Sequence, residues 1–355
     1  MLPQLKTSDF DYPLPEELIA QRPAKERDLS RLMVLDRRTG RINNRTFTDI
    51  ASYLNPSDVL VLNDTMVIPA RLYGIKVAPK RNSSGQGGGA RIEVFLHRKV
   101  KGRVWEVLAR PAKRLKVGTI VRFGKILSAR NLGVAPDGKN LLMFKYKGDF
   151  ENILKKKGVI PLPPYIRDSR HGKDAGKLAK RYQTVYASAK GATAAPTAGL
   201  HFTKSLLDNL KGNGVQIEYI TLHTGLGTFQ PVKTEYIDDH KMHSEEYKVD
   251  RNVIKRIMRA KIEGRRIVAV GTTVVRLLES LAKGARTKGE TSLFIRPGHE
   301  FKIVDAMITN FHLPRSTLIV LVSAFAGQDL IKKAYTQAIR KRYRFFSFGD
   351  AMLIV

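Results

Sequence analysis

The chain of 355 residues contains no cysteine and carries 63 Lys and Arg against 32 Asp and Glu, a formal net charge of +31. The lack of thiols excludes disulfides and thiolate metal sites and favours a reducing cytoplasm. No secretory signal opens the chain, and its most apolar run, 318–326, is shorter than the ~20 residues of a bilayer span, so we expect a soluble cytoplasmic protein without membrane attachment. The positive charge favours a polyanionic partner, above all nucleic acid, against the alternative of a general basic drift or adaptation to salt or heat.

From residue 1 to about 69, apolar runs at 31–37 and 58–64 lie between turn-rich stretches, which predicts strands and one helix at 15–20. From 71 to about 148, short alternating segments predict a small all-β barrel or sandwich: "RIEVFLHR", "RVWEVLAR", "TIVRFG" and "LLMFKYKG". The Gly- and Ser-rich stretch 81–89 has the composition of a flexible hairpin tip, and we assign it no function.

After about residue 155, strands alternate with helices. Thr203 is placed to cap a helix whose apolar face carries Leu206, Leu207 and Leu210. A helix over 251–263 is expected to bury one face, consisting of Val253, Ile254, Ile257 and Ile262. This order is typical of an α/β domain. We therefore expect residues 1–70 and 150–355 to form one discontinuous α/β domain, with an all-β domain, 71–149, inserted into it.

Small residues surround one titratable side chain in "ATAAPTAGLHF", 192–202. A segment with little side-chain bulk lets backbone approach another group closely, and Gly199 relaxes the limits on the dihedral angles. His201 is therefore a candidate for acid–base chemistry at near-neutral pH, and a hydrogen-bonded core histidine is the alternative.

Two further segments place glycines and hydroxyls at strand ends. "HTGLGTF", 223–229, fits either a plain turn or one wall of a small-molecule pocket. In "VGTTVVR", 270–276, Thr272 or Thr273 is suited to cap a helix, and the same exposed N–H groups suit a ligand carboxylate or a ribose oxygen.

The segment "DDHKMHSEEY", 238–247, holds His240, His243 and Glu245. Acid–base chemistry or substrate contact, a solvated turn and a metal site are all open, but no cysteine or second metal-binding motif supports the metal. In "NFHLPRS", 310–316, Asn310 is able to read the edge of a base, and His312 precedes a proline bend. "RPAKR", "RYQTVYA" and "KRYRFF" combine cations with aromatic residues or turns, as RNA-binding surfaces do, and each is also compatible with a solvated face.

Together with these segments, "LNDTMVIPARL", "IPLPPYIR", "TNFHLPRSTLIVLVSAFAG" and "YRFFSFGDAMLI" occur in the order found in the S-adenosylmethionine:tRNA ribosyltransferase-isomerase family of queuosine biosynthesis. The chain resembles this family from about Asp9 to Val355. Three residues depart from the family's usual pattern, because Met66, Thr224 and Val274 stand where arginine, valine and serine are usual.

The resemblance implies an irregular α/β barrel with an inserted β-barrel domain. It also implies transfer of the ribosyl part of S-adenosylmethionine to 7-aminomethyl-7-deazaguanine at the tRNA wobble position. Isomerisation then gives epoxyqueuosine, adenine and methionine, and no metal is expected. In this interpretation the small residues lie against the adenosine ribose while His201 faces the reacting carbon.

We assign catalysis to His201, His243 and Glu245. Expected S-adenosylmethionine contacts are Thr197, Gly199, Gly225, Gly227, Thr228, Thr272, Thr273, Asn310 and His312. Expected RNA contacts are Lys113, Arg114, Arg181 and Arg315. We expect a monomer. Two alternative functions are considered. A non-catalytic basic RNA-binding protein explains only the charge, and a His/Glu metallohydrolase explains only the histidine cluster.

Overall fold

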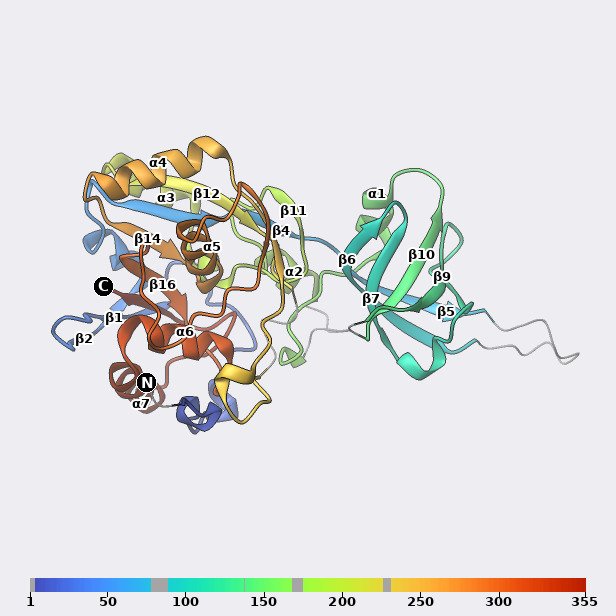
Figure 1. Cartoon of the computed structure of the whole chain (residues 1–355), viewed down its shortest axis with the longest axis horizontal. Helices are drawn as coiled ribbons and strands as arrows, with labels where there is room; N and C mark the ends of the chain where they lie inside the picture. The colour runs from blue at the N-terminus through green and yellow to red at the C-terminus, as the bar shows by residue number, and fades with distance from the viewer. Residues whose placement is uncertain (1–3, 78–88, 137, 168–174, 226–230) are drawn as a thin grey trace, which may run out of the picture. The chain divides into compact units, whose positions relative to one another are not determined.

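The computed structural model describes residues 4–77, 89–136, 138–167, 175–225 and 231–355. The chain forms two compact units, residues 67–161 and residues 1–66 with 162–355 (Figure 1). The second junction lies beyond the expected residue 149 because α1 (Phe150–Lys157) packs Ile153 and Leu154 into the core of the smaller unit.

The smaller unit is a closed barrel of six strands in the order β10-β7-β6-β5-β8-β9. Its strands are β5 (Arg71–Lys76), β6 (Arg91–Lys101), β7 (Val104–Arg110), β8 (Ile120–Arg122), β9 (Leu127–Val134) and β10 (Asn140–Tyr146). Side chains of a strand point alternately to its two faces, so Leu142 and Phe144 of β10 fill the core while Met143 is exposed. The predicted all-β segment is thereby confirmed as a barrel.

The larger unit is built on a nine-stranded sheet in the order β15-β13-β12-β3-β14-β16-β17-β1-β2. Its strands are β1 (Arg31–Leu35), β2 (Ile42–Thr46), β3 (Val59–Asn63), β12 (Gln216–Leu222), β13 (Glu245–Lys248), β14 (Ile267–Val270), β15 (Lys288–Thr291), β16 (Ala306–Asn310) and β17 (Ala351–Ile354). The central strands β12, β3, β14 and β16 are parallel. A separate pair is formed by β4 (Thr65–Val67) and β11 (Ala189–Ala192).

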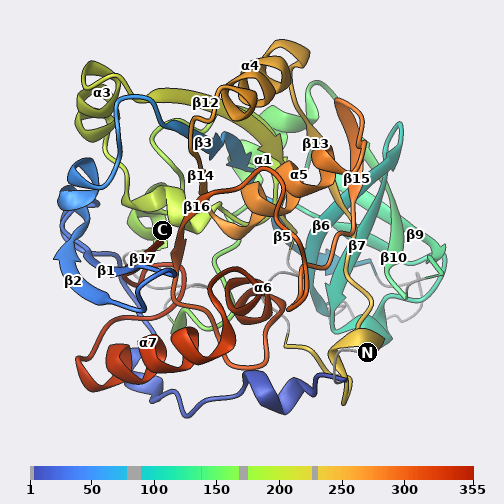
Figure 2. The same cartoon turned by 60° about the vertical axis from the view of Figure 1, so that its left-hand side comes forward.

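Both faces of this sheet are covered, which explains why β3 and β14 read as continuous apolar runs. Val59 and Val61 of β3 join one hydrophobic core, and Leu60 and Leu62 join the other. The first core includes α4 (Arg251–Ile262), α5 (Thr272–Ala282), α6 (Thr317–Ala326) and α7 (Gln328–Arg340). The second includes η3 (Phe47–Ser52), η6 (Thr197–His201) and α3 (Lys204–Gly212), and Figure 2 shows α3 and α7 well separated around the sheet. A further helix is α2 (Ala175–Arg181).

The mixed α/β class with a closed β-barrel is confirmed, but the sheet of the larger unit differs from the expected irregular α/β barrel. Among the described strands, the order ends at β15 on one side and β2 on the other, so the sheet is open. Closure needs the two outer strands to pair, whereas β2 ("INNRT") is a polar, half-exposed strand that pairs only with β1 in this order.

Two local predictions need correction. The helix expected at 15–20 is a single 3-10 turn, η2 (Glu16–Leu18), because the chain leaves it in extended form at Ile19, which bridges to Phe345. The helix expected at 251–263 is α4, but Ile262 is 87% exposed at its last residue and Ala260 takes the buried position. The cap predicted at Thr203 is confirmed, since its Oγ1 accepts a hydrogen bond from the Leu206 amide at 3.1 Å.

Candidate active site

The four parallel strands end on the same edge of the sheet, and two strands of opposite direction begin there. β16 ends at Asn310, which pairs with Ala351 at the start of β17. Ala351 also pairs with Leu32 near the start of β1. Ser30 and Asp350, which precede β1 and β17, therefore lie at the edge where open α/β sheets bind their ligands.

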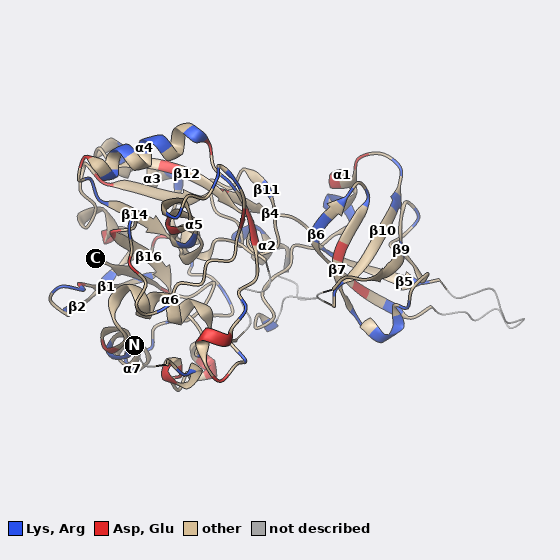
Figure 3. Cartoon of the chain, viewed as in Figure 1, with Lys and Arg blue, Asp and Glu red and all other residues tan. Residues whose placement is uncertain are grey.

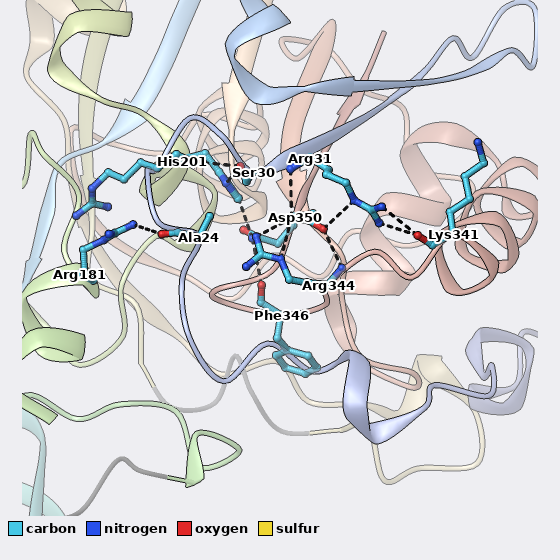
Figure 4. Close-up of polar contacts among 11 residues, drawn as sticks. Ala24, Ser30, Arg31, Arg181, His201, Lys341, Arg344, Phe346 and Asp350 are labelled. Atoms are coloured by element: carbon cyan, nitrogen blue, oxygen red, sulfur yellow. Dashed lines mark hydrogen bonds and ion pairs between the residues drawn. The ribbon is translucent and has the colours of Figure 1, made fainter. Parts of the chain in front are cut away.

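His201 lies at this edge because η6 packs against β16. Its side chain is buried, and its ring stacks on Phe47 with 5.0 Å between the ring centroids. Both ring nitrogens have partners within the protein: Nδ1 is 2.7 Å from Ser30 Oγ and Nε2 is 3.0 Å from Asn310 Nδ2 (Figure 4). The histidine therefore belongs to a hydrogen-bonded chain.

The donor and acceptor in each of these hydrogen bonds follow from the backbone carbonyl groups at the two ends of the series. Asn310 Nδ2 also donates to the Phe346 carbonyl at 3.2 Å, which fixes the orientation of the amide. The same amide donates to His201 Nε2, so this nitrogen is the unprotonated one. Nδ1 then carries the hydrogen and donates to Ser30 Oγ, whose hydroxyl donates to the Arg27 carbonyl at 3.2 Å.

Electrostatics agree with a neutral imidazole. Burial lowers the pKa of His201 to about 4, because the charged form loses its hydration. The carboxylate of Asp350 raises this pKa, and the guanidinium groups of Arg344 and Arg27 lower it. Near pH 7 the site thus contains a neutral histidine with its lone pair on Nε2.

Asp350 organises the surrounding turn. It is buried and accepts hydrogen bonds from the Arg344 backbone amide at 2.9 Å and from Arg344 Nη2 at 2.7 Å. It also accepts from the Arg31 backbone amide at 3.2 Å, and the Arg31 guanidinium continues to the Lys341 carbonyl (Figure 4). This carboxylate joins the starts of β1 and β17 and closes the turn that carries the Phe346 carbonyl.

A pocket open to solvent lies beside His201. Its polar lining includes Arg27, Ser30, Arg181, His201 and Ser347. Arg27 and Ser30 belong to the segment before β1, and no sequence motif pointed to either of them. The pocket therefore brings together His201, a predicted catalytic residue, and Arg181, a predicted RNA contact.

The small residues before His201 make close contacts within the protein. A Cβ at Gly199 would lie 2.0 Å from the Tyr186 hydroxyl, so glycine is needed for this packing. A Cβ at Gly271, at the end of β14, would lie 3.6 Å from Ala198 Cβ, so this segment packs directly against the start of α5. The close approach that the sequence indicated is thus made by Tyr186.

The other predicted S-adenosylmethionine contacts are distributed along the same edge. Thr272 and Thr273 are buried in the first turn of α5, whose N-cap is Gly271, so neither threonine has the capping role considered for it. Thr197 begins η6 and is partly buried. Gly227 and Thr228 lie outside the described residues.

His312 belongs to a different network from His201. Its Nε2 is 2.8 Å from Thr309 Oγ1, and its backbone amide donates to the Tyr335 hydroxyl at 3.0 Å. Burial lowers the pKa of His312 to about 3. His312 is therefore a neutral histidine that packs between α7 and the end of β16.

Glu245 and His243, predicted to act together, have different environments. Glu245 is buried, forms an ion pair with the buried Arg276, and accepts a hydrogen bond from the Gly225 amide at 3.3 Å. His243 is exposed. The carboxylate of Glu245 therefore binds the Gly225 amide and Arg276, and no contact among the described residues joins it to the His201 network.

Sequence reasoning left His223 out of the candidate site, although it follows β12 at the same sheet edge. Its Nδ1 is 2.8 Å from Thr65 Oγ1, and burial lowers its pKa, opposed by Glu246 and Asp64. Gly191 lies directly over the ring, because a Cβ there would come within 2.8 Å of Nε2. The position of "HTGLGTF" at a strand end was the signal that could have identified it.

The four predicted RNA contacts are divided between the two units. Lys113 and Arg114 are exposed in η4 (Ala112–Arg114) of the barrel unit. Arg181 lines the His201 pocket, and Arg315 is neutralised by an ion pair with Asp11. Arg315 is therefore the least suited of the four to a phosphate.

The cluster of His240, His243 and Glu245 is not arranged as a metal centre: within the described ranges, no group of three or more His, Asp or Glu side chains could hold a metal ion. His240 instead packs edge-on against Phe294. No helix in the described part of the chain is long and apolar enough to cross a membrane.

The three departures from the family pattern have distinct environments. Val274 is fully buried in the core formed with α6 and α7, where an apolar side chain packs well. Thr224 is buried, and its Oγ1 has no hydrogen-bond partner among the described residues. Met66 lies in β4 and is partly buried, and nothing in the structure explains methionine at this position.

Comparison with known proteins covers nearly the whole chain. Proteins called S-adenosylmethionine:tRNA ribosyltransferase-isomerase are 51% identical in Halothermothrix orenii and in Acetivibrio thermocellus, over 99% of this chain and 100% of each relative. A crystal structure of S-adenosylmethionine tRNA ribosyltransferase from Thermotoga maritima is 40% identical, with a TM-score of 0.55 over 98% of this chain and 100% of that one. The family model described as queuosine biosynthesis protein matches residues 7–354, and the chain belongs to this family.

Proposed function

We propose that this chain is a cytoplasmic S-adenosylmethionine:tRNA ribosyltransferase-isomerase. Its substrates are S-adenosylmethionine and a tRNA with 7-aminomethyl-7-deazaguanine at the wobble position. The ribosyl group moves to the aminomethyl nitrogen and is isomerised to an epoxycyclopentane, while adenine and methionine leave. The observation that carries this proposal is the full-length similarity to relatives with this name, at 51% identity.

The reaction needs groups that move protons near neutral pH. The sulfonium of S-adenosylmethionine acidifies the adjacent ribose carbon, so a neutral base can start the rearrangement, and adenine leaves more readily when protonated. His201 supports this proposal because it is neutral, has its lone pair on Nε2 and lines a pocket. For the lone pair to reach a substrate, the Asn310 amide must first release Nε2.

Binding of the two substrates is assigned to different features. We place S-adenosylmethionine at the carboxyl edge of the sheet, with Thr197, Gly199, Gly225, Thr272, Thr273 and Asn310 among the contacts, together with Gly227 and Thr228. The tRNA is attracted by the basic side chains, including Lys113 and Arg114, and the target nucleotide must leave the anticodon stack to reach the sheet edge. The protein acts as a monomer in this proposal.

The direct test measures adenine released from S-adenosylmethionine. We expect release with tRNA that carries the aminomethyl base and none with tRNA that carries guanine at this position. No release with the correct tRNA would contradict the proposed function and leave a non-catalytic RNA-binding role.

Substitution of His201 tests its catalytic role. His201→Ala should lower turnover by about a hundredfold or more, the usual contribution of a general acid or base, with little change in substrate affinity. His97→Ala, in the barrel unit, is the control and should retain turnover. Near-normal turnover of His201→Ala with a lower Tm would identify a core histidine and direct the search to His223 or His243.

A further inference from the structure

The pocket beside His201 contains two guanidinium groups, and among the described residues their hydrogen-bond acceptors are backbone carbonyls. Arg27 donates to the Leu200 carbonyl at 3.0 Å and to the Gln183 carbonyl at 2.8 Å. Arg181 donates to the Ala24 carbonyl at 2.8 Å (Figure 4) and to the Lys25 carbonyl at 2.9 Å. A carbonyl accepts a hydrogen bond without neutralising the positive charge, so none of these four contacts compensates a guanidinium group.

The two cations are close enough to affect each other. The pKa of Arg27 is lowered, first by burial and then by the charge of Arg181. In addition, Arg181 Nε is buried and has no hydrogen-bond partner among the described residues. A buried donor without an acceptor is unfavourable, and two cations that no described carboxylate pairs with increase the cost at one pocket, unless an anion binds there.

We propose that Arg27 and Arg181 form a binding site for one oxyanion, a phosphate or a carboxylate, beside His201. Both arginines line this open pocket, and Ser30 and Ser347 add hydroxyl groups to its lining. The guanidinium forks supply planar donors of the kind that bind phosphate and carboxylate. The site thus fixes an anionic part of a substrate next to the neutral imidazole.

Two sources can supply this oxyanion if the proposed function is correct, namely a phosphodiester of the tRNA and the carboxylate of S-adenosylmethionine. The charge of the pocket favours the phosphodiester. S-adenosylmethionine carries a sulfonium and an ammonium group near its single carboxylate, and both are repelled by paired guanidinium groups. A phosphodiester brings a negative charge without a neighbouring cation.

The first test uses inorganic phosphate, which requires no reaction and so does not depend on the proposed function. Phosphate, compared with chloride at equal ionic strength, should raise the Tm of the wild-type protein, because a ligand of the folded state stabilises it. Arg181→Gln removes the charge but keeps an amide donor for one carbonyl, and it should lose this stabilisation. The matched control is Arg259→Gln on the exposed face of α4, which should respond like the wild type.

Arg181→Lys distinguishes loss of charge from a folding defect. Lysine restores the positive charge without the planar guanidinium group, so it should recover part of the stabilisation by phosphate. Equal phosphate responses in Arg181→Gln, Arg259→Gln and the wild type would overturn the proposal. Loss of the response in both Arg181→Gln and Arg259→Gln would also overturn it, because removal of any positive charge would then explain the loss.

The second test distinguishes the sources. If a phosphodiester binds, Arg181→Gln should reduce the salt slope of tRNA affinity by about 0.7 to 0.9 and leave S-adenosylmethionine affinity by calorimetry unchanged. If the methionine carboxylate binds, the calorimetric affinity should fall and the tRNA slope should stay the same. Either result supports the oxyanion site, and no change in both would contradict it.

Discussion

The barrel unit and the larger unit use their charged residues differently. Residues 67–161 contain 22 Lys and Arg but only 5 Asp and Glu, whereas the rest of the chain contains 41 and 27 (Figure 3). Because the barrel unit has far fewer carboxylates than cations, most of its Lys and Arg side chains have no carboxylate of the same unit to pair with. In the larger unit, buried carboxylates such as Asp350 and Glu218 bind arginines and join separate segments of the chain.

Charged residues therefore have two different effects in the two units: attraction of distant ions in one and fixation of local geometry in the other. Unpaired exposed cations create a positive field that attracts a polyanion and depends on salt. Paired charges with one buried partner fix geometry, and they are less screened by solvent ions. The charge of the barrel is thus of the kind that attracts a polyanion, whereas the ion pairs of the larger unit fix the positions of side chains.

The largest expected effect concerns a buried charge of the larger unit. Asp350→Ala should lower the free energy of unfolding by about 3 kcal/mol, because two guanidinium groups and two amides lose their acceptor. Urea denaturation measures the change. Lys113→Ala with Arg114→Ala, in the barrel, should change stability by less than about 0.5 kcal/mol. Equal losses of stability in the two variants would contradict this difference between the units.

A smaller effect is expected from reversing two charges of the barrel. Lys113→Glu with Arg114→Glu should weaken tRNA binding by about tenfold at moderate salt and make the salt dependence shallower. Lys255→Glu with Arg259→Glu, on the exposed face of α4, changes the charge by the same amount and should weaken binding less. Fluorescence titration at several salt concentrations measures both. A stronger effect of the α4 variant would place the main RNA surface on the larger unit.

The smallest effect near neutral pH concerns the titration of His201. Its pKa is lowered from 6.5 to about 4 in the folded protein, so the unfolded state binds a proton first as the pH falls. The resulting stability is fully present above pH 6.5 and is lost as the pH falls towards 4. His201→Gln removes this one proton. The slope of the unfolding free energy against pH should therefore fall by up to about 1.4 kcal/mol per pH unit. An unchanged slope would show that His201 keeps its ordinary pKa.

Sequence patterns determined the features that depend on neighbouring residues. The alternation in "RIEVFLHR" and "LLMFKYKG" indicated barrel strands, and Thr203 before an apolar face indicated the start of α3. These predictions succeeded because side-chain direction within a strand and capping of a helix depend on nearby positions in the chain. The motifs also identified the family.

Only the tertiary structure decided what His201 contacts. Arg27 and Ser30 precede β1 and Asn310 ends β16, far from His201 in the sequence, and they meet because β1, β16 and η6 reach the same edge of the sheet. The tautomer of His201 depends on the Phe346 carbonyl, and its low pKa depends on burial by Phe47 and other distant residues. Such contacts depend on strand order and register, which no local pattern specifies, so the sequence could name the histidine but could not identify its partners.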